Sequence, residues 1–259
     1  YIDSREVTIS LDSQVTRVVS LSPNISETIY ALGGQDLLVG RTDYCNYPEA
    51  ITSVPSVGDL MSPSIEKIIS LEPDIVLVST LGQNQTIESL ENSGITVAYI
   101  NKSQSMEGTF SLIEDVGLLL DKNDEAKAII EEMKEEINQV ITRVSPLEKV
   151  SVYYVAGFGQ WGDFTATGDT FIHEMIEIAG GTNIAKNASN WTFSLEELLA
   201  NDPEIIILPP TWGATFEETK EAFESYEAYQ SLSALKNGAI FSADSDTLNR
   251  QGPRSAHAV

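Results

Sequence analysis

The chain has 259 residues, enough to bury a sizeable core as either one large domain or two small ones. Its formal net charge at pH 7 is −24; such a surface repels phosphate backbones, so nucleic-acid binding is disfavoured, and we interpret the acidity as an adaptation for solubility. No apolar run approaches the roughly 20 residues that a membrane helix needs.

The first part of the chain alternates short apolar strands with helices. Strands are predicted at residues 17–21, 37–40, 75–78 and 96–100. Ser26 is predicted to cap a helix that ends at Gly33-Gly34, because glycine commonly terminates helices. A second helix begins at a Ser64 cap and is followed by a turn at Pro73. Strands that alternate with helices predict a parallel sheet covered on both faces.

The segment 123–144 breaks this rhythm. Its apolar residues recur at spacings of one, three and four, Asn123 can cap its start, and acids follow in its first turn. These features predict one amphipathic helix, which Ser145-Pro146 would end. At 1.5 Å per residue the helix would span on the order of 33 Å. We expect it to act as a rigid spacer between the parts of the chain on either side.

Beyond residue 146 the alternation starts again. Strands are predicted at 150–155, 205–208 and 239–241, and helices at 171–178 and 217–229. Gly180-Gly181 would close the helix at 171–178. The second half of the chain therefore resembles the first in its order of elements.

Two segments of the chain repeat one pattern. SIEKIISLEPDIVL at 64–77 is matched by SLEELLANDPEIII at 194–207, and in both the Pro lies nine residues after the Ser and between two acids. Two copies at a long period indicate two similar lobes rather than a solenoid of short repeats. We therefore expect an N-terminal lobe at 1–121, a linking helix at 122–145 and a C-terminal lobe at 146–259. Two lobes form a cleft, and clefts of this kind bind ligands.

The motifs of common enzyme classes are missing. The pattern GxGxxG occurs at 157–162 after a strand, but no helix is predicted to begin there, and GxxxxGK(S/T) is absent, so no complete phosphate-binding loop is predicted. His173 and His257 are the only histidines and lie far apart in the sequence, which leaves no metal site built on several His residues. Cys45 is the only cysteine and has no evident base partner. We expect no catalysis and no resident cofactor or metal, and one cysteine does not identify the compartment.

Several segments, taken together, resemble a known family. They are 5–9, 16–23 and 27–33, then Val39-Gly40, Tyr47-Pro48, Val57-Gly58 and the first repeat at 64–76. In combination they are similar to the substrate-binding proteins of ABC importers for vitamin B12, haem and iron–siderophores. The resemblance covers nearly the whole chain.

This resemblance implies an α/β fold of two Rossmann-like lobes with parallel sheets, bridged by one long α-helix, with the ligand cleft between the lobes. It also implies an extracytoplasmic location, either periplasmic or as a cell-surface lipoprotein whose anchoring Cys would precede Tyr1. The implied partners are the membrane subunits of an ABC transporter. The protein itself would be a monomer that touches the membrane only through such a lipid anchor.

Within the family, the chain is most similar to the cobalamin-binding members. Their ligand-facing residues have counterparts in this chain at Tyr44, Trp161, Phe164, Trp191, Asp246 and Arg250. Tyr44 lies just before a Tyr-Pro pair, and Asp246 and Arg250 are spaced by four before a Pro-Arg. Trp191 precedes the Ser of the second repeat, and Phe164 follows the strand that opens the second lobe. The resemblance implies that these residues contact the ligand.

The implied ligand is a corrinoid, either cobalamin or cobinamide. A flat macrocycle requires aromatic and apolar faces with a few directed donors. Phe158 and Trp212 also lie at predicted strand ends, where they either face the ligand or pack in the core. An iron–siderophore or haem is the alternative: the arginines are few for an anionic siderophore, whereas Tyr44 could be the axial ligand of a haem. A metal-cluster protein or enzyme on paired lobes is less favoured, because clusters need several Cys.

Glu66 and Glu196 occupy equivalent positions in the two repeats. Each follows a Ser cap by two residues, so each lies in the exposed first turn of its helix. An acid at this position can simply complement the helix dipole. The resemblance implies a further role, in which these two glutamates meet arginines on the two membrane subunits of the transporter.

Overall fold

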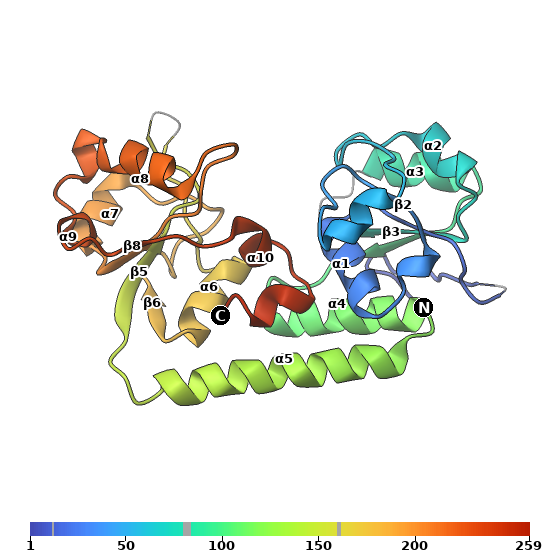
Figure 1. Cartoon of the computed structure of the whole chain (residues 1–259), viewed down its shortest axis with the longest axis horizontal. Coiled ribbons are helices and arrows are strands. Elements are labelled where there is room, and N and C mark those ends of the chain that lie inside the picture. Colours follow the sequence, from blue (N-terminus) through green and yellow to red (C-terminus); the bar gives the residue numbers. More distant parts are fainter. Residues whose placement is uncertain (12, 80–83, 160–161) are drawn as a thin grey trace. The chain divides into compact units, whose positions relative to one another are not determined.

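The computed structural model describes residues 1–11, 13–79, 84–159 and 162–259. The chain forms two compact units (Figure 1). Unit 1 comprises Tyr1–Ser103 and Glu107–Met133, and unit 2 comprises Gln104–Met106 and Lys134–Val259. Each unit is built around its own parallel sheet.

The sheet of unit 1 has four parallel strands in the order β2-β1-β3-β4. They are β1 (Val18–Ser20), β2 (Leu38–Arg41), β3 (Ile75–Ser79) and β4 (Val97–Ile100). Every residue of β1 and β3 is buried. A central parallel strand has both faces covered, and this explains why these segments read as continuous apolar runs.

The helices of unit 1 are α1 (Pro23–Ala31), α2 (Ile65–Ser70), α3 (Asn84–Asn92) and α4 (Met106–Leu119), with short 3-10 turns at Gln35–Leu37 and Glu49–Ser53. These helices connect the strands, except for α4, which follows β4 and leads to α5 (Asn123–Val144). Beside the sheet, a core cluster joins side chains of these helices to the strands, among them Val19, Ile68, Val76, Ile87 and Leu90.

The prediction that Ser26 caps the first helix is wrong. The cap position is Ser22, four residues earlier, and the helix begins at Pro23, because proline has its φ preset for a first helical position and has no N–H left unpaired there. Ser26 is instead fully buried within α1, where its hydroxyl donates to Ser20 Oγ at 2.8 Å and lies 3.1 Å from Cys45 Sγ.

Unit 2 repeats the strand order of unit 1, as β6-β5-β7-β8, and all its strand pairs are parallel. Its strands are β5 (Val150–Tyr154), β6 (Gly181–Asn183), β7 (Ile205–Ile207) and β8 (Ile240–Phe241). The short β6 was not predicted, because Gly-Thr-Asn shows no apolar alternation. It pairs with β5 directly after the glycine turn that ends the preceding helix.

The helices of unit 2 are α6 (Phe171–Ile178), α7 (Leu195–Asn201), α8 (Phe216–Glu224), α9 (Ser233–Lys236) and α10 (Ser245–Asn249), with 3-10 turns at Glu227–Tyr229 and Pro253–Ala256. The single helix predicted at 217–229 is wrong in its second half. Tyr226 takes an extended conformation, with φ −73° and ψ 118°, and so interrupts the helix. The interruption allows the rings of Phe223 and Tyr229 to stack with centroids 4.5 Å apart.

The predicted long helix is present as α5, Asn123–Val144, with its 22 residues as expected. The division between the units falls inside it, after Met133. In unit 1, α4 approaches α5 closely: a Cβ at Gly117 would lie 2.6 Å from the Cβ of Ala126. Glycine at position 117 therefore permits this contact, since a larger residue would force the two helices apart.

Each copy of the sequence repeat forms the same local structure in its own unit. Ser64 Oγ accepts a hydrogen bond from Lys67 N at the start of α2, and Ser194 Oγ accepts one from Glu197 N at the start of α7. The acid before each proline takes a positive φ, 46° at Glu72 and 42° at Asp202. This left-handed residue ends the helix and turns the chain towards the next strand.

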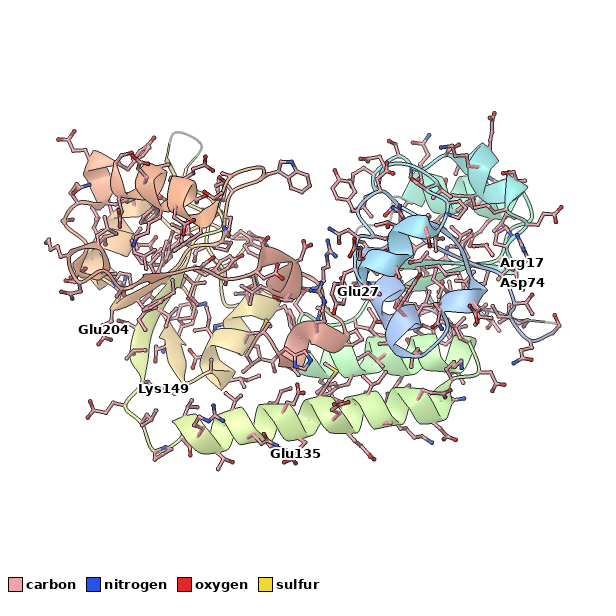
Figure 2. All side chains as sticks on the ribbon, viewed as in Figure 1. Arg17, Glu27, Asp74, Glu135, Lys149 and Glu204 are labelled. Carbon is pink, nitrogen blue, oxygen red and sulfur yellow. The ribbon has the colours of Figure 1, made fainter. Side chains whose placement is uncertain are left out.

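The acid after each proline fixes the beginning of the neighbouring first strand. Asp74 Oδ2 accepts from Thr16 N at 2.7 Å and from Arg17 N at 2.9 Å, while Glu204 Oε2 accepts from Ser151 N at 2.8 Å. The pKa of each carboxyl is lowered, chiefly by these backbone hydrogen bonds. Figure 2 labels Arg17, Asp74 and Glu204 at these places. Each copy of the repeat thus specifies a helix cap, a left-handed turn and a carboxylate that holds the start of the neighbouring strand.

Candidate functional site

The strand order places a candidate site in unit 2. β5 is the first strand, β6 pairs on one side of it and β7 on the other, so the strand order reverses between β5 and β7. In open parallel sheets, ligands bind in the crevice outside the carboxyl ends of the strands at this reversal. A pocket of about 300 Å³ opens there.

The pocket is formed by three groups of residues. The segment after β5 contributes Tyr154 to Phe158, and the segment after β7 contributes Leu208 to Trp212. The remaining lining residues are Trp191, Ser245 and Asn249. Of the residues at which the sequence predicted ligand contact, Trp191 belongs directly to this lining.

The backbone around Trp191 is held in place while its ring remains partly open. Asn190 and Trp191 both have positive φ, 59° and 61°, which is a strained conformation for residues with a Cβ. Trp191 N donates to Thr167 Oγ1 at 3.1 Å, and Thr165 N donates to the carbonyl of Trp191 at 3.0 Å. The side chain is 38% exposed. The loop therefore presents an aromatic surface from a fixed backbone.

Phe164 lies next to the pocket on a short antiparallel bridge. Its backbone pairs with Gly157 on one side and Thr192 on the other. Its ring packs over Gly157, because a Cβ at that position would lie 3.1 Å from Phe164 Cδ2. The side chain is 41% exposed. Trp161, the other aromatic residue predicted in this segment, lies outside the described residues.

Trp212 is the most exposed of the large apolar side chains in the described part of the chain, at 93%. This exposure rules out the core packing that the sequence left open for it. Two prolines precede it, and Thr211 N donates to Thr219 Oγ1 of α8 at 3.0 Å. Phe158, in contrast, both lines the pocket and packs edge-on against the ring of Phe223 with centroids 5.1 Å apart.

The sequence analysis did not identify the polar groups of the pocket. Tyr154 is buried at the end of β5, and burial raises the pKa of its phenol to about 12, although a hydrogen bond from Asn249 opposes this increase. The group is therefore a neutral hydroxyl at physiological pH. Asn249 lies on α10, a helix that becomes visible only once the fold is known. The one sequence signal that could have identified Tyr154 as a pocket residue is its position at the end of a predicted strand.

Asp246 and Arg250 are also carried by α10 and its end. Arg250 Nη2 lies 2.8 Å from Asp246 Oδ2, and the Arg side chain is 13% exposed. Their neighbours in sequence, Ser245 and Asn249, line the pocket. The pair is thus formed as the spacing of four suggests, and one short helix carries it together with two lining residues.

Tyr44 lies in unit 1, in the turn that follows β2. Cys45 N donates to the carbonyl of Thr42 at 3.1 Å and Asp43 N donates to that of Gly58 at 2.9 Å, so the turn is well fixed. The Tyr44 side chain is 40% exposed. The residues that directly follow β3, at the corresponding edge of this sheet, lie outside the described part of the chain.

Glu66 and Glu196 are both exposed, and each occupies the second position of its helix. At α7 the capping box is completed by Glu197 rather than by Glu196. Across the residues that the structure describes, no helix is long and apolar enough to cross a membrane.

Comparison with known proteins identifies the family to which this fold belongs. The family model for periplasmic binding proteins matches residues 18–247. The ABC transporter substrate-binding lipoprotein YvrC of Bacillus subtilis (strain 168) is 29% identical, over 99% of this chain and 82% of its own length. A cobalamin-binding protein of Halobacterium salinarum (strain ATCC 29341 / DSM 671 / R1) is 27% identical, over 97% of this chain and 69% of its own length.

Among solved structures, a periplasmic solute-binding protein from Staphylococcus epidermidis ATCC 12228, named as a possible iron-binding protein, superposes with a TM-score of 0.84. It is 26% identical, and the match covers 95% of this chain and 96% of that one. The chain belongs to the periplasmic binding protein family, whose members are the substrate-binding proteins of ABC transporters and not enzymes.

Proposed function

We propose that this protein captures a corrinoid, cobalamin or cobinamide, outside the cytoplasmic membrane and delivers it to an ABC transporter. The observation that carries the proposal is the pocket at the carboxyl ends of β5 and β7, whose described lining is aromatic and uncharged and can take one part of such a ligand. The similarity to a cobalamin-binding relative supports the same ligand class. A lipid anchor preceding Tyr1, as in a lipoprotein, is part of this proposal.

The chemistry of the exposed aromatic residues suits a flat macrocycle. Phe164 and Trp191 each present a partly exposed ring from a backbone held by hydrogen bonds. Rings that are fixed before binding lose little conformational entropy when a planar ligand stacks on them. We propose these two residues as stacking contacts, together with Tyr44 of unit 1 and with Trp161, which lies outside the described residues.

Asp246 and Arg250 supply the polar contacts of this proposal. A guanidinium presents several donors in one plane, which suits the amide carbonyls and the phosphate of a corrinoid. The Asp246 carboxylate, 2.8 Å away, orients the guanidinium or accepts from ring amides. The site as proposed would hold the ligand through a few directed bonds and a large apolar contact.

Glu66 and Glu196 are proposed as the contacts with the membrane subunits. Both are exposed acids at matching positions of the two repeats, so they offer one negative charge on each unit. The double change Glu66→Ala and Glu196→Ala should leave corrinoid affinity intact and reduce complex formation and uptake, and more so than either single change. Uptake at the wild-type rate by the double variant would show that these acids only complement their helix dipoles.

An absorption experiment tests the ligand class directly. The purified protein is incubated with cyanocobalamin, haemin or a ferric siderophore in separate samples and is then freed of unbound ligand. We expect the corrinoid spectrum alone to be retained with the protein. A retained haem spectrum would favour Tyr44 as an axial ligand and would contradict the corrinoid proposal.

A further inference from the structure

The pocket of unit 2 is too small to hold a whole corrinoid. Its volume of about 300 Å³ lies at the lower end of the range for sites that enclose a drug-sized molecule, roughly 300 to 1,000 Å³. A corrin macrocycle with its amide side chains is much larger than such a molecule. The pocket is therefore suited to one compact part of the ligand rather than to the macrocycle.

The walls of this pocket select for a flat group. Trp191 and Trp212 both line it, and Pro209 and Pro210 form part of the segment between β7 and Trp212. Thr211 N donates to Thr219 Oγ1 of α8 at 3.0 Å. The backbone is therefore fixed at the residue before Trp212. Indole rings on fixed backbones are good stacking surfaces for a planar ring.

The polar groups in the lining are neutral. They are the phenol of Tyr154, the hydroxyls of Thr211 and Ser245, and the amide of Asn249. Among the lining residues that the structure describes, none carries a carboxylate, an ammonium or a guanidinium. Such a lining offers hydrogen bonds to neutral polar atoms such as hydroxyls, and no counter-charge for an ionised group.

We propose that this pocket binds a flat, uncharged heteroaromatic group that the ligand carries beside its macrocycle, which in a cobalamin is the nucleotide base. This inference rests on the proposed function. It makes Trp212 a specificity-determining residue that stacks on the base, a contact that the resemblance did not assign. It also predicts that the protein prefers complete cobalamins to cobinamide, which lacks the nucleotide.

The test compares two ligands on matched variants by calorimetry. Stacking of one base on an aromatic side chain corresponds to about 5- to 150-fold in affinity. The wild type should bind cyanocobalamin more tightly than dicyanocobinamide by a factor in this range. Trp212→Ala should remove most of that preference by weakening cobalamin binding alone, and Trp212→Phe should restore part of it.

The variants are suitable because Trp212 is 93% exposed, so its replacement should not disturb folding. Phe241→Ala, at another exposed aromatic position of unit 2 outside the pocket lining, is the control and should preserve the preference. Equal affinity of the wild type for both ligands, or an equal loss for both in Trp212→Ala, would overturn the inference while leaving corrinoid capture in place.

A second arm separates this inference from the proposed function. Protein with 15N-labelled tryptophan is titrated with free 5,6-dimethylbenzimidazole, and the indole signals are followed by NMR. The signals of Trp191 and Trp212, assigned through the variants, should shift at millimolar concentrations of the base. If neither corrinoid binds but these signals shift, the proposed function fails and the pocket assignment holds. If the base leaves both signals unmoved, the pocket assignment is wrong.

Discussion

At the scale of single residues, carboxylates in this chain mainly organise the backbone. Asp74 and Glu204 accept backbone hydrogen bonds at the start of the first strand of each unit, and Asp202 accepts from Ser233 N at 2.7 Å. The pKa of each of these three carboxyls is lowered, mainly because hydrogen bonds favour the charged form. A part of the strong negative charge therefore has a structural role, which composition alone did not indicate.

Asp74→Asn should destabilise the protein in a pH-dependent manner. The pKa of Asp74 in the folded chain lies below its ordinary value of 3.8, so its stabilising effect is complete above that value and is lost as the pH falls through the folded pKa. We expect a loss of about 0.5–1.5 kcal/mol in the free energy of unfolding at neutral pH, and a clearly smaller loss at an acidic pH below 3.8. Urea denaturation at both pH values measures this.

Glu88→Gln is the matched control for that measurement, since Glu88 is an exposed acid on α3. It should change the free energy of unfolding little at either pH. A loss in Asp74→Asn that persists undiminished at low pH would show that the carboxylate charge is not what anchors the strand.

Arg250 should contribute to ligand binding through its planar guanidinium. Arg250→Lys keeps the positive charge but cannot present two parallel donors, and Arg250→Ala removes both. Both changes should weaken corrinoid binding, by roughly tenfold or more for Ala. Affinities that match the wild type in both variants, measured by calorimetry, would remove Arg250 from the site.

At the scale of elements, Gly159 and Asp163, which neighbour Phe158 and Phe164 in the sequence, are held by the residues after α8. Tyr229 donates its hydroxyl proton to Asp163 Oδ1 and accepts from Gly159 N at 3.0 Å. Burial and the neighbouring Asp163 raise the pKa of this phenol, so it stays protonated and keeps donating. Gly159 has φ +83°, and a Cβ there would lie 2.8 Å from the Tyr226 ring.

Tyr229→Phe should therefore release Gly159 and Asp163 without changing the core volume. The change leaves two polar partners without the hydroxyl and should cost about 1–3 kcal/mol of stability. Hydrogen exchange at the Gly159 amide should become faster, because that amide loses its acceptor. Tyr226→Phe is the control, at a ring that is 37% exposed. Unchanged exchange at Gly159 in Tyr229→Phe would refute the role of this hydroxyl.

Most strands could be predicted from the sequence, whereas helices such as α3 and α4 were not, and several of the errors have identifiable causes. The start of α1 was misplaced because Ser26 was interpreted as the cap, although Pro23 fits the first position of a helix. β6 was missed because its position depends on pairing with β5 and not on its own residues. The pocket lining by Tyr154 and Asn249 depends on tertiary contacts between β5 and α10, which no local pattern records.

At the scale of the whole molecule, the sequence repeat predicted two similar units. Each copy specifies the same helix cap, the same left-handed turn and the same acid that holds the start of a strand. α5 runs as one uninterrupted helix of 22 residues through the division between the units. A large rotation of the units would have to bend or break hydrogen bonds within this helix. We therefore expect only small closure on ligand binding. Small-angle scattering should give nearly equal radii of gyration with and without cyanocobalamin, and a marked compaction would refute this expectation.

The central claim is that the protein is a corrinoid receptor, and titration calorimetry with cyanocobalamin tests it most directly. We predict saturable binding of one ligand per chain, with a negative heat-capacity change that reflects apolar contact with the aromatic residues. Heats that show no corrinoid binding, together with tight binding of a ferric siderophore under the same conditions, would contradict the account.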